Sequence, residues 1–347
     1  MNKRLVAGTI AGVMAMSMLA GCGSSSSSTT TATSTAAGST ATAAAASGGE
    51  NMTLIMSQRD EFLSTLENAA NDQAKKMGIT LTAQDAQSDV SKQLQYIETA
   101  VNAGEAAVIV NLVDAETGEE CIQAAGDLPI VFVNRAPSDI TLLDKYENAS
   151  LVASDEMQSG GYQAEYLAEY FKEKGQTDIK YILVSGILGQ VSTTNRTTSA
   201  VEGLKEAGIN AEEVTTLVCD YDRAEAQTQI SPLLGTEEFD CVISNNDAMA
   251  LGVIEAMKSA DIDPSSIPIV GVDCTPDGAQ AVKDGEMYMT VFQNPVGQGA
   301  GAVIAAKNMI DGKAINDGTD YELSEESESI MWIPFEPVTK DNVDEYM

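Results

Sequence analysis

The chain has 347 residues, with 19 lysine and arginine side chains against 52 aspartate and glutamate side chains and a formal net charge of −33. A field of that sign repels the phosphates of nucleic acids and anionic lipids, which argues against partners of either kind. The sequence contains no histidine, so it excludes Ser-His-Asp and Cys-His catalysis and any metal site with a histidine ligand.

The N-terminal segment is expected to direct export and then to tether the protein. Two basic residues precede an apolar stretch, residues 5–18, that is too short to span a bilayer, and small residues lead to Cys22. This arrangement resembles a bacterial lipoprotein export signal, in which residues 1–21 are removed and Cys22 carries the lipid. Residues 22–50 are almost wholly Ser, Thr, Ala and Gly, which predicts a flexible tether.

From residue 51 onwards, short apolar runs alternate with amphipathic stretches. The strand candidates are Thr53–Ser57, Ala107–Asn111, Ile130–Asn134, Tyr181–Ser185, Thr215–Asp220, Cys241–Asn245, Ile269–Asp273 and Tyr288–Gln293. The helix candidates include Glu61–Met77, Val90–Ala103, Gly160–Lys174, Asn195–Ala207 and Ala248–Ala260. Repeated alternation of strand and helix predicts βαβ units, and therefore parallel sheets with helices on both faces.

A strand–helix–strand pattern occurs twice in the chain. An apolar run ending in asparagine at 108–111 is followed by a similar run at 129–134. The pair 242–245 and 268–273 repeats the same arrangement. Two similar sheets of about 130 residues each fit the usual size of a domain better than one large sheet.

Polar side chains stand at the carboxyl ends of the predicted strands, where open parallel sheets bind their ligands. They are Asn134–Arg135, Asn245–Asp247, Asp273 and Gln293. An asparagine or aspartate at such a position can instead cap the following helix. Four polar ends together favour a binding site.

Three motifs in order carry a family resemblance: FVNRAP at 132–137, NNDAMALG at 245–252 and GVDCTP at 271–276. With the segments around them, they resemble the type I periplasmic sugar-binding proteins, above all the galactose/glucose-binding and ribose-binding members. The resemblance extends from Leu54 to Thr339. It implies an α/β fold of two Rossmann-like lobes, each a parallel sheet flanked by helices.

The same resemblance implies lobes that are discontinuous in sequence and joined by a hinge of three crossing strands. The crossings are expected near Ser154–Asp155, Asn294–Pro295 and Ile330–Pro334. The N-terminal lobe would then comprise residues 51–154 plus 295–330. The C-terminal lobe would comprise residues 155–294 plus 331–347.

The resemblance also implies a sugar site built from planar polar groups, which pair well with hydroxyls, and from two aromatic rings, which cover the apolar faces of a pyranose. The expected ligand-binding residues are Asp60, Phe62, Asn134, Arg135, Gln190, Arg196, Tyr221, Asn246, Asp273 and Gln293. Other readings place Phe62 in the core, Tyr221 on the surface, and Arg196 in an ion pair with Asp273 across the lobes.

The identity of the sugar is left open by two departures from the family pattern. Gln190 stands where a galactose binder has histidine, and Ser192 stands where it has a carboxylate. Residues 172–178 lack the spaced oxygen ligands of a calcium loop, so no structural metal is expected.

Four cysteines remain besides Cys22, at Cys121, Cys219, Cys241 and Cys274. They have no CxxC spacing and are expected to be small buried residues, although an extracytoplasmic setting also permits a disulfide.

The resemblance implies an extracytoplasmic lipoprotein, anchored in the bacterial cell membrane only through its lipid. It would act as a monomer that captures a galactose-like or glucose-like monosaccharide and delivers it to the permease of an ABC importer, without catalysis and without a cofactor.

One alternative is a sensor that presents a sugar or a furanosyl signal to a kinase or chemotaxis receptor. Another is a surface glycoside hydrolase, although no pair of catalytic carboxylates is evident. A transcription regulator of similar fold is excluded because the chain has an export signal and no DNA-binding segment.

Overall fold

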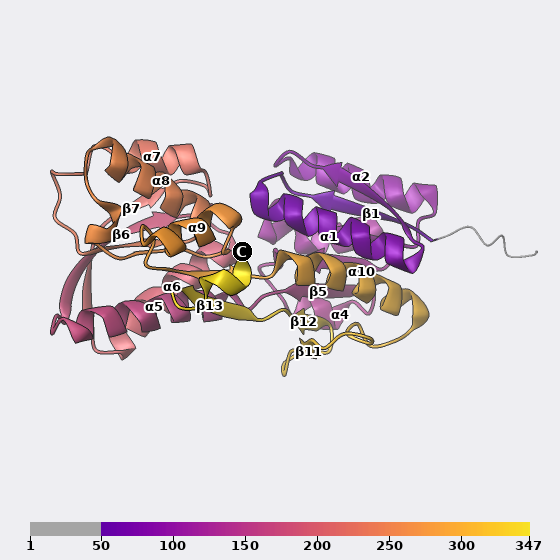
Figure 1. The fold of residues 1–347 in the computed structure, drawn as a ribbon. Coiled ribbons are helices and arrows are strands. Elements are labelled where there is room, and N and C mark those ends of the chain that lie inside the picture. Colours follow the sequence, from indigo (N-terminus) through magenta and orange to yellow (C-terminus); the bar gives the residue numbers. More distant parts are fainter. Residues whose placement is uncertain (1–49) are drawn as a thin grey trace, which may run out of the picture. The chain divides into compact units, whose positions relative to one another are not determined.

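The computed structural model of the protein describes residues 50–347, which form two open sheets (Figure 1). The export signal, Cys22 and residues 22–49 of the tether lie outside the described residues. The first sheet has the spatial order β11 (Glu322–Leu323), β12 (Ile330–Trp332), β5 (Ala149–Ala153), β4 (Ile130–Val133), β3 (Ala107–Val110), β1 (Asn51–Met56) and β2 (Thr80–Asp85). The second has the order β13 (Phe335–Thr339), β10 (Met289–Gln293), β9 (Ile269–Val270), β8 (Cys241–Ser244), β6 (Asp178–Ser185) and β7 (Asn210–Val218).

The predicted two-lobed α/β fold is confirmed. All strand pairs are parallel except β11 with β12 and β10 with β13, which place one antiparallel strand at an edge of each sheet. The repeated strand–helix–strand pattern corresponds to β3 beside β4 and to β8 beside β9, which are parallel neighbours in the two sheets.

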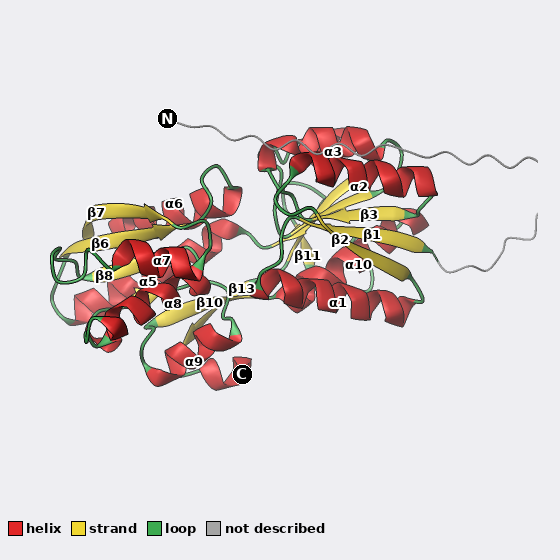
Figure 2. Ribbon diagram, turned by 90° about the horizontal axis from the view of Figure 1, so that it is seen from above, coloured by secondary structure: helices red, strands yellow, loops and turns green. Residues whose placement is uncertain are grey.

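Helices cover both faces of each sheet (Figure 2). Those of the first lobe are α1 (Glu61–Met77), α2 (Val90–Ala103), α3 (Gly118–Ala125), α4 (Leu142–Lys145) and α10 (Pro295–Asp311). Those of the second lobe are α5 (Glu156–Glu173), α6 (Val191–Glu206), α7 (Arg223–Ile230), α8 (Asp247–Ser259) and α9 (Pro276–Asp284). Short 3-10 helices lie at Ala115–Thr117, Pro264–Ser266 and Val343–Tyr346.

The alternation of side chains along the strands explains this double cover. In β3, Ile109 belongs to the core cluster shared with α1 and α10, whereas Val110 belongs to the cluster shared with α2 and α3. Because successive side chains of a strand point to opposite faces, a strand buried on both faces is apolar throughout. The run at 107–110 has this character, which is why it could be recognised as a strand.

The chain passes between the two lobes three times. The first passage follows β5 at Ser154–Asp155, and the second follows β10 at Asn294–Pro295. The third lies at Ile333–Pro334, because β12 still pairs with β5 through Trp332. Ile333 also donates to the carbonyl oxygen of Ala153 and lies in the core of the first lobe, so the boundary expected at residue 330 is three residues too early.

The four cysteines of the described residues are free and buried, as the sequence predicted. Burial raises the pKa of the thiols of Cys121, Cys219 and Cys274 to about 12. Among residues 50–347, no helix combines the length and the apolar character that a membrane span requires.

Candidate ligand-binding site

One pocket of about 80 Å³ is lined by residues of both lobes. All ten of the expected ligand-binding residues line it, from Asp60 in the first lobe to Gln293 in the second. A cavity needs about 10 to 15 Å³ to hold each water molecule, so this pocket has room for about five to eight waters. The volume of the pocket is therefore of the size that a small polar ligand requires.

A larger cleft of about 1120 Å³ adjoins this pocket. The two cavities share Asn134, Arg135, Glu156, Gln190 and Ser192. We place the candidate site in the smaller cavity because the strand-end polar groups converge there, whereas the larger one is bordered by the segment around β11.

Backbone strain is concentrated at the pocket. Among the described residues, eight that are not glycine have positive φ, and three of them line the pocket: Asn134 (66°), Tyr221 (64°) and Asp273 (119°). Asp220 and Cys274 are their direct neighbours in sequence. Such conformations are rare for residues with a side chain and gather at functional sites, where the fold must aim a group in one direction.

The first lobe contributes Asp60 and Phe62 from the start of α1. One oxygen of Asp60 caps this helix, accepting a hydrogen bond of 2.7 Å from the amide of Leu63. The other oxygen accepts from Gln58 at 3.3 Å, and the carboxylate remains exposed at the pocket. Phe62 is half-buried and packs against the core while lining the pocket. Its contact with a ligand stays a prediction.

The first lobe also contributes Asn134 and Arg135 from the end of β4. The amide oxygen of Asn134 accepts a bond of 3.1 Å from Asn111, and its nitrogen donates a bond of 3.1 Å to Gln298. The guanidinium of Arg135 donates one bond of 3.1 Å, to the carbonyl oxygen of Leu112. A guanidinium carries five N–H donors, so Arg135 has several to offer to a ligand.

Tyr221 is held at the pocket by three contacts. Its hydroxyl lies 2.9 Å from the hydroxyl of Ser192 and 2.8 Å from that of Thr193. Its ring lies over Gly186, where an added Cβ would come within 2.2 Å of the ring. Tyr221 is therefore half-buried and fixed in place at the pocket, and its contact with a ligand stays a prediction.

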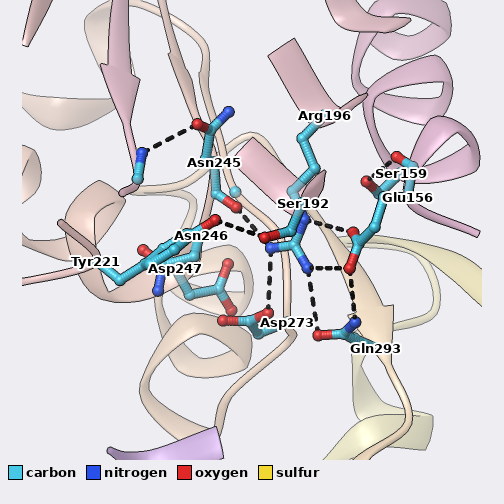
Figure 3. Close-up of polar contacts among 12 residues, drawn as sticks. Glu156, Ser159, Ser192, Arg196, Tyr221, Asn245, Asn246, Asp247, Asp273 and Gln293 are labelled. Carbon is cyan, nitrogen blue, oxygen red and sulfur yellow. Dashed lines mark hydrogen bonds and ion pairs between the residues drawn. The ribbon is translucent and has the colours of Figure 1, made fainter. Parts of the chain in front are cut away.

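Arg196 in α6 is the centre of a buried polar cluster in the second lobe (Figure 3). Its Nε and Nη2 donate bonds of 2.7 and 3.2 Å to the two carboxylate oxygens of Glu156. Its Nη2 also donates to Gln293 at 3.3 Å, and its Nη1 donates to the carbonyl oxygen of Asn245 at 2.7 Å. Asp273 lies 3.6 Å from Nη1.

The ion pair of Arg196 with Asp273 lies within the second lobe, because α6 and the segment after β9 both belong to it. The alternative reading of a pair across the lobes is therefore wrong in its location. Burial alone would lower the pKa of Arg196, but the carboxylates of Glu156 and Asp273 outweigh that effect and raise it.

Asn246 caps α8, accepting a bond of 3.0 Å from the amide of Met249, and its side-chain nitrogen remains for a ligand. Asn245 and Asp247 do not cap this helix. Asn245 accepts from the amide of Gly186 at 3.0 Å. Asp247 is fully buried and accepts from the hydroxyl of Thr290 at 2.6 Å.

Two acidic side chains of this region have raised pKa values. Burial raises the pKa of Asp273 well above its usual range, although Arg196 opposes the effect. Burial likewise raises the pKa of Asp247 to about 7. In both cases desolvation disfavours the ionised form.

Sequence reasoning missed Glu156, which lines the pocket and binds Arg196 through both oxygens. It lies outside the motifs that carried the resemblance, and an acid in the first turn of a helix is common because the helix dipole favours it there.

Within residues 50–347, no group of three or more cysteine or acidic side chains is arranged to hold a metal ion. The expectation that the protein needs no calcium stays a prediction.

Comparison with known proteins gives consistent matches over most of the chain. Residues 53–314 match the family described as the periplasmic binding protein domain. A putative rhizopine-binding protein of Rhizobium meliloti is 34% identical over 292 residues, covering 83% of this chain and 89% of the relative. The D-galactose/methyl-galactoside binding periplasmic protein of Haemophilus influenzae is 30% identical over 300 residues, covering 83% and 88%.

A solved structure shows the same fold. It is an ABC transporter solute binding protein from Bacillus halodurans with bound myo-inositol. The TM-score is 0.75 at 29% sequence identity, and the match covers 87% of this chain and 98% of that one.

Proposed function

This chain belongs to the periplasmic binding protein family, and from that premise we propose that it captures a monosaccharide, galactose-like or glucose-like, in the pocket between its lobes. The captured sugar would be delivered unchanged to the permease of an ABC importer. The family consists of substrate-binding proteins and not of enzymes, which sets the glycoside hydrolase reading aside.

The observation that carries this proposal is an unpaired polar atom at the pocket. Gln190 is only 7% exposed, and its Oε1 has no hydrogen-bond partner among the described residues. Buried polar atoms are nearly always paired, because leaving one unpaired costs about 1 to 3 kcal/mol. A hydroxyl group of a ligand would supply the missing donor.

The other lining groups suit a molecule covered with hydroxyls. Asn246 offers an amide nitrogen and Arg135 offers free guanidinium N–H groups, while Asp60 offers carboxylate lone pairs. A hydroxyl both donates and accepts, so it can satisfy groups of both kinds. Phe62 and Tyr221 supply apolar surface for the C–H faces of a sugar ring.

Ligand-driven closure follows from the distribution of these groups. Asp60, Phe62, Asn134 and Arg135 belong to the first lobe, and the other expected residues belong to the second. A ligand that contacts both sets binds the closed arrangement more tightly and shifts the population towards it. The passages at Ser154–Asp155, Asn294–Pro295 and Ile333–Pro334 would act as the hinge.

We further propose that Cys22 anchors the protein to the outer side of the cell membrane. Relatives of this chain are periplasmic proteins, which agrees with an extracytoplasmic location. The residues before Cys22 fit lipoprotein processing, and two acyl chains suffice for stable anchoring. Cys22→Ala should release the protein from the membrane fraction, and full retention of this variant would contradict lipidation.

The sugar itself is to be found by a thermal-shift panel on residues 50–347, with aldohexoses, pentoses, inositols and furanoses. We expect one neutral sugar to raise the melting temperature and to bind by calorimetry. Small-angle scattering should then show contraction on binding. The proposal fails if no carbohydrate in the panel binds or if the sugar is recovered chemically altered.

A further inference from the structure

The guanidinium of Arg196 is held by protein acceptors. It donates four hydrogen bonds, to both oxygens of Glu156, the side-chain oxygen of Gln293 and the carbonyl oxygen of Asn245, and Asp273 lies 3.6 Å from Nη1 as an ion-pair partner. Arg196 is only 4% exposed. A ligand that takes a hydrogen bond from Arg196 must therefore compete with these protein groups.

Glu156 is the acceptor that is tied most firmly to Arg196. It meets Nε and Nη2 at 2.7 and 3.2 Å, whereas Asp273 is 3.6 Å from Nη1. Glu156 is 7% exposed, and its Oε1 also accepts from Gln293 at 3.4 Å. Paired bonds of this kind between a guanidinium and a carboxylate are strong and fix the geometry of both groups.

The position of Glu156 in the chain adds to this restraint. It is the first residue of α5 and directly follows the passage between the lobes at Ser154–Asp155. A carboxylate at this end of a helix is favoured by the helix dipole. Its place at the start of α5 therefore favours the ionised carboxylate that Arg196 meets.

Without Glu156, the Nε and Nη2 groups of Arg196 would lose the carboxylate that they meet. Two such N–H groups side by side match a carboxylate or a phosphate of a ligand. With Glu156 present, the pocket lining has four acidic side chains, Asp60, Glu61, Glu156 and Asp273, against two guanidiniums, Arg135 and Arg196. Even with Asp273 protonated, the carboxylates outnumber the guanidiniums, which opposes the entry of an anion.

We propose that Glu156 determines the charge selectivity of this pocket, by occupying Arg196 as an internal carboxylate and so excluding sugars that carry a carboxylate or a phosphate. The inference rests on the proposed sugar-binding function and narrows the ligand class to sugars and polyols without negative charge. Glu156 acts through Arg196 and needs no contact with the ligand.

The first test uses the unaltered protein. Once the panel has identified a neutral hexose that binds, calorimetry compares it with D-galacturonate and D-glucuronate. We expect the acids to bind at least tenfold more weakly than the neutral sugar. Binding of either acid within tenfold of the neutral sugar overturns the inference while leaving sugar binding intact. A protein that binds no neutral sugar overturns the proposed function and this inference with it.

The second test is Glu156→Gln, which keeps the shape of the side chain and removes its charge. We expect the affinity for at least one uronate, relative to the neutral sugar, to rise tenfold or more, an effect that a purely structural role would not produce. Loss of neutral-sugar affinity without any gain for uronates contradicts the inference. Glu61→Gln is the matched control, because Glu61 lines the same pocket, is exposed and makes no hydrogen bond or ion pair with Arg196 in the described residues. An equal gain in this control would also overturn the inference.

A third measurement covers the case in which Glu156→Gln does not fold. Glu156→Ala leaves a space beside Arg196 that propionate can fill. Propionate should raise the melting temperature of Glu156→Ala and leave that of the unaltered protein unchanged, whereas propionamide should not. Equal effects of propionate and propionamide would show that the negative charge at this position is not what Arg196 requires.

Discussion

Asn134 donates a hydrogen bond of 3.1 Å to Gln298, which lies 164 residues further along the chain in α10. Gln298 is fully buried, and its own amide nitrogen donates a bond of 2.9 Å to the hydroxyl of Ser154. Ser154 stands at the first passage between the lobes. A pocket side chain is thus connected through one glutamine to the segment on which the lobes would turn.

Gln298→Met should weaken sugar binding and lower stability together. The change keeps the volume but removes the acceptor of the Asn134 amide nitrogen and the donor to the Ser154 hydroxyl, at a cost of about 1 to 3 kcal/mol in the free energy of unfolding. Because Asn134 also loses its orientation, we expect sugar affinity to fall by roughly tenfold, equivalent to one hydrogen bond of about 1.4 kcal/mol. Urea unfolding and calorimetry measure the two effects.

The control for this variant is Asn308→Leu in the same helix. Asn308 is buried and donates to the carbonyl oxygens of Ile315 and Asp317, which do not line the pocket. It should lose stability and keep its sugar affinity. An equal fall of affinity in both variants would mean that Gln298 acts only through stability.

Gly186→Ala should displace Tyr221 from the pocket. The new methyl group would come within 2.2 Å of the Tyr221 ring, so the ring must move and its bonds to Ser192 and Thr193 must break. Overpacking of this kind costs about 1 to 3 kcal/mol in the free energy of unfolding. We expect the free energy of sugar binding to weaken by a similar amount. Gly161→Ala in α5 is the control, because nothing lies within 4 Å of the added Cβ. Unchanged affinity in Gly186→Ala would remove Tyr221 from the site.

Arg196→Met should abolish sugar binding and also destabilise the fold. The substitution leaves Glu156 buried without its counter-ion, and breaking a buried pair in this way costs about 3 to 5 kcal/mol. Urea unfolding of the ligand-free variant measures this cost, and a loss below about 1 kcal/mol would contradict the structural role given to the pair.

The cost of Asp247→Asn should depend on pH. Burial raises the pKa of Asp247 to about 7 in the folded protein, so the folded state holds this proton more tightly than the unfolded chain does. The resulting stability is present below the unfolded pKa, near 4, and is lost as the pH rises through about 7. The asparagine side chain of the variant cannot titrate, so the destabilisation caused by the substitution should be about 2 kcal/mol larger at pH 5 than at pH 8.

Asp263→Asn is the control, and its cost should not change between pH 5 and pH 8. Hydrogen bonds from Ser265 lower the pKa of Asp263, so its contribution is present above the unfolded pKa, near 4, and is lost only as the pH falls below it. Urea unfolding of both variants and of the unaltered protein at pH 5 and pH 8 makes the comparison. A cost of Asp247→Asn that does not change with pH would contradict the raised pKa.

The sequence predicted those elements whose apolar pattern is complete. The bounds of α1 and α2 agree with the predicted ranges, because Asp60 and Asp89 cap their starts and Gly78 and Gly104 end them with φ of 72° and 69°. Strand β2 escaped detection, since it lies at the edge of its sheet and no residue in it is fully buried.

Helix α10 was not among the predicted helices, for a different reason. Three glycines at 297, 299 and 301 are unusual inside a helix and lower its propensity. Gly299 is needed because a Cβ there would lie 2.2 Å from the carbonyl oxygen of Leu66 in α1. The close packing of two helices, a tertiary property, thus overrides the local preference.

The family motifs predicted residues that line the pocket, but they did not predict the ion pair between Glu156 and Arg196. The motifs name residues such as Asn134 and Asp273 one at a time, and all ten line one cavity. The pairing of Glu156 with Arg196 joins positions 40 residues apart, and no pattern along the chain reports which carboxylate a given arginine will meet.

The four buried thiols of residues 50–347 should be inert towards maleimide at neutral pH. Burial holds the pKa of Cys121, Cys219 and Cys274 near 12, so almost no reactive thiolate exists, and Cys241 is equally enclosed. In a protein of residues 50–347, one cysteine introduced on the surface of each lobe would therefore give two reactive thiols for a fluorophore pair. Energy transfer between the two dyes could then follow the opening and shutting of the protein in real time, without removal of any of the four buried cysteines.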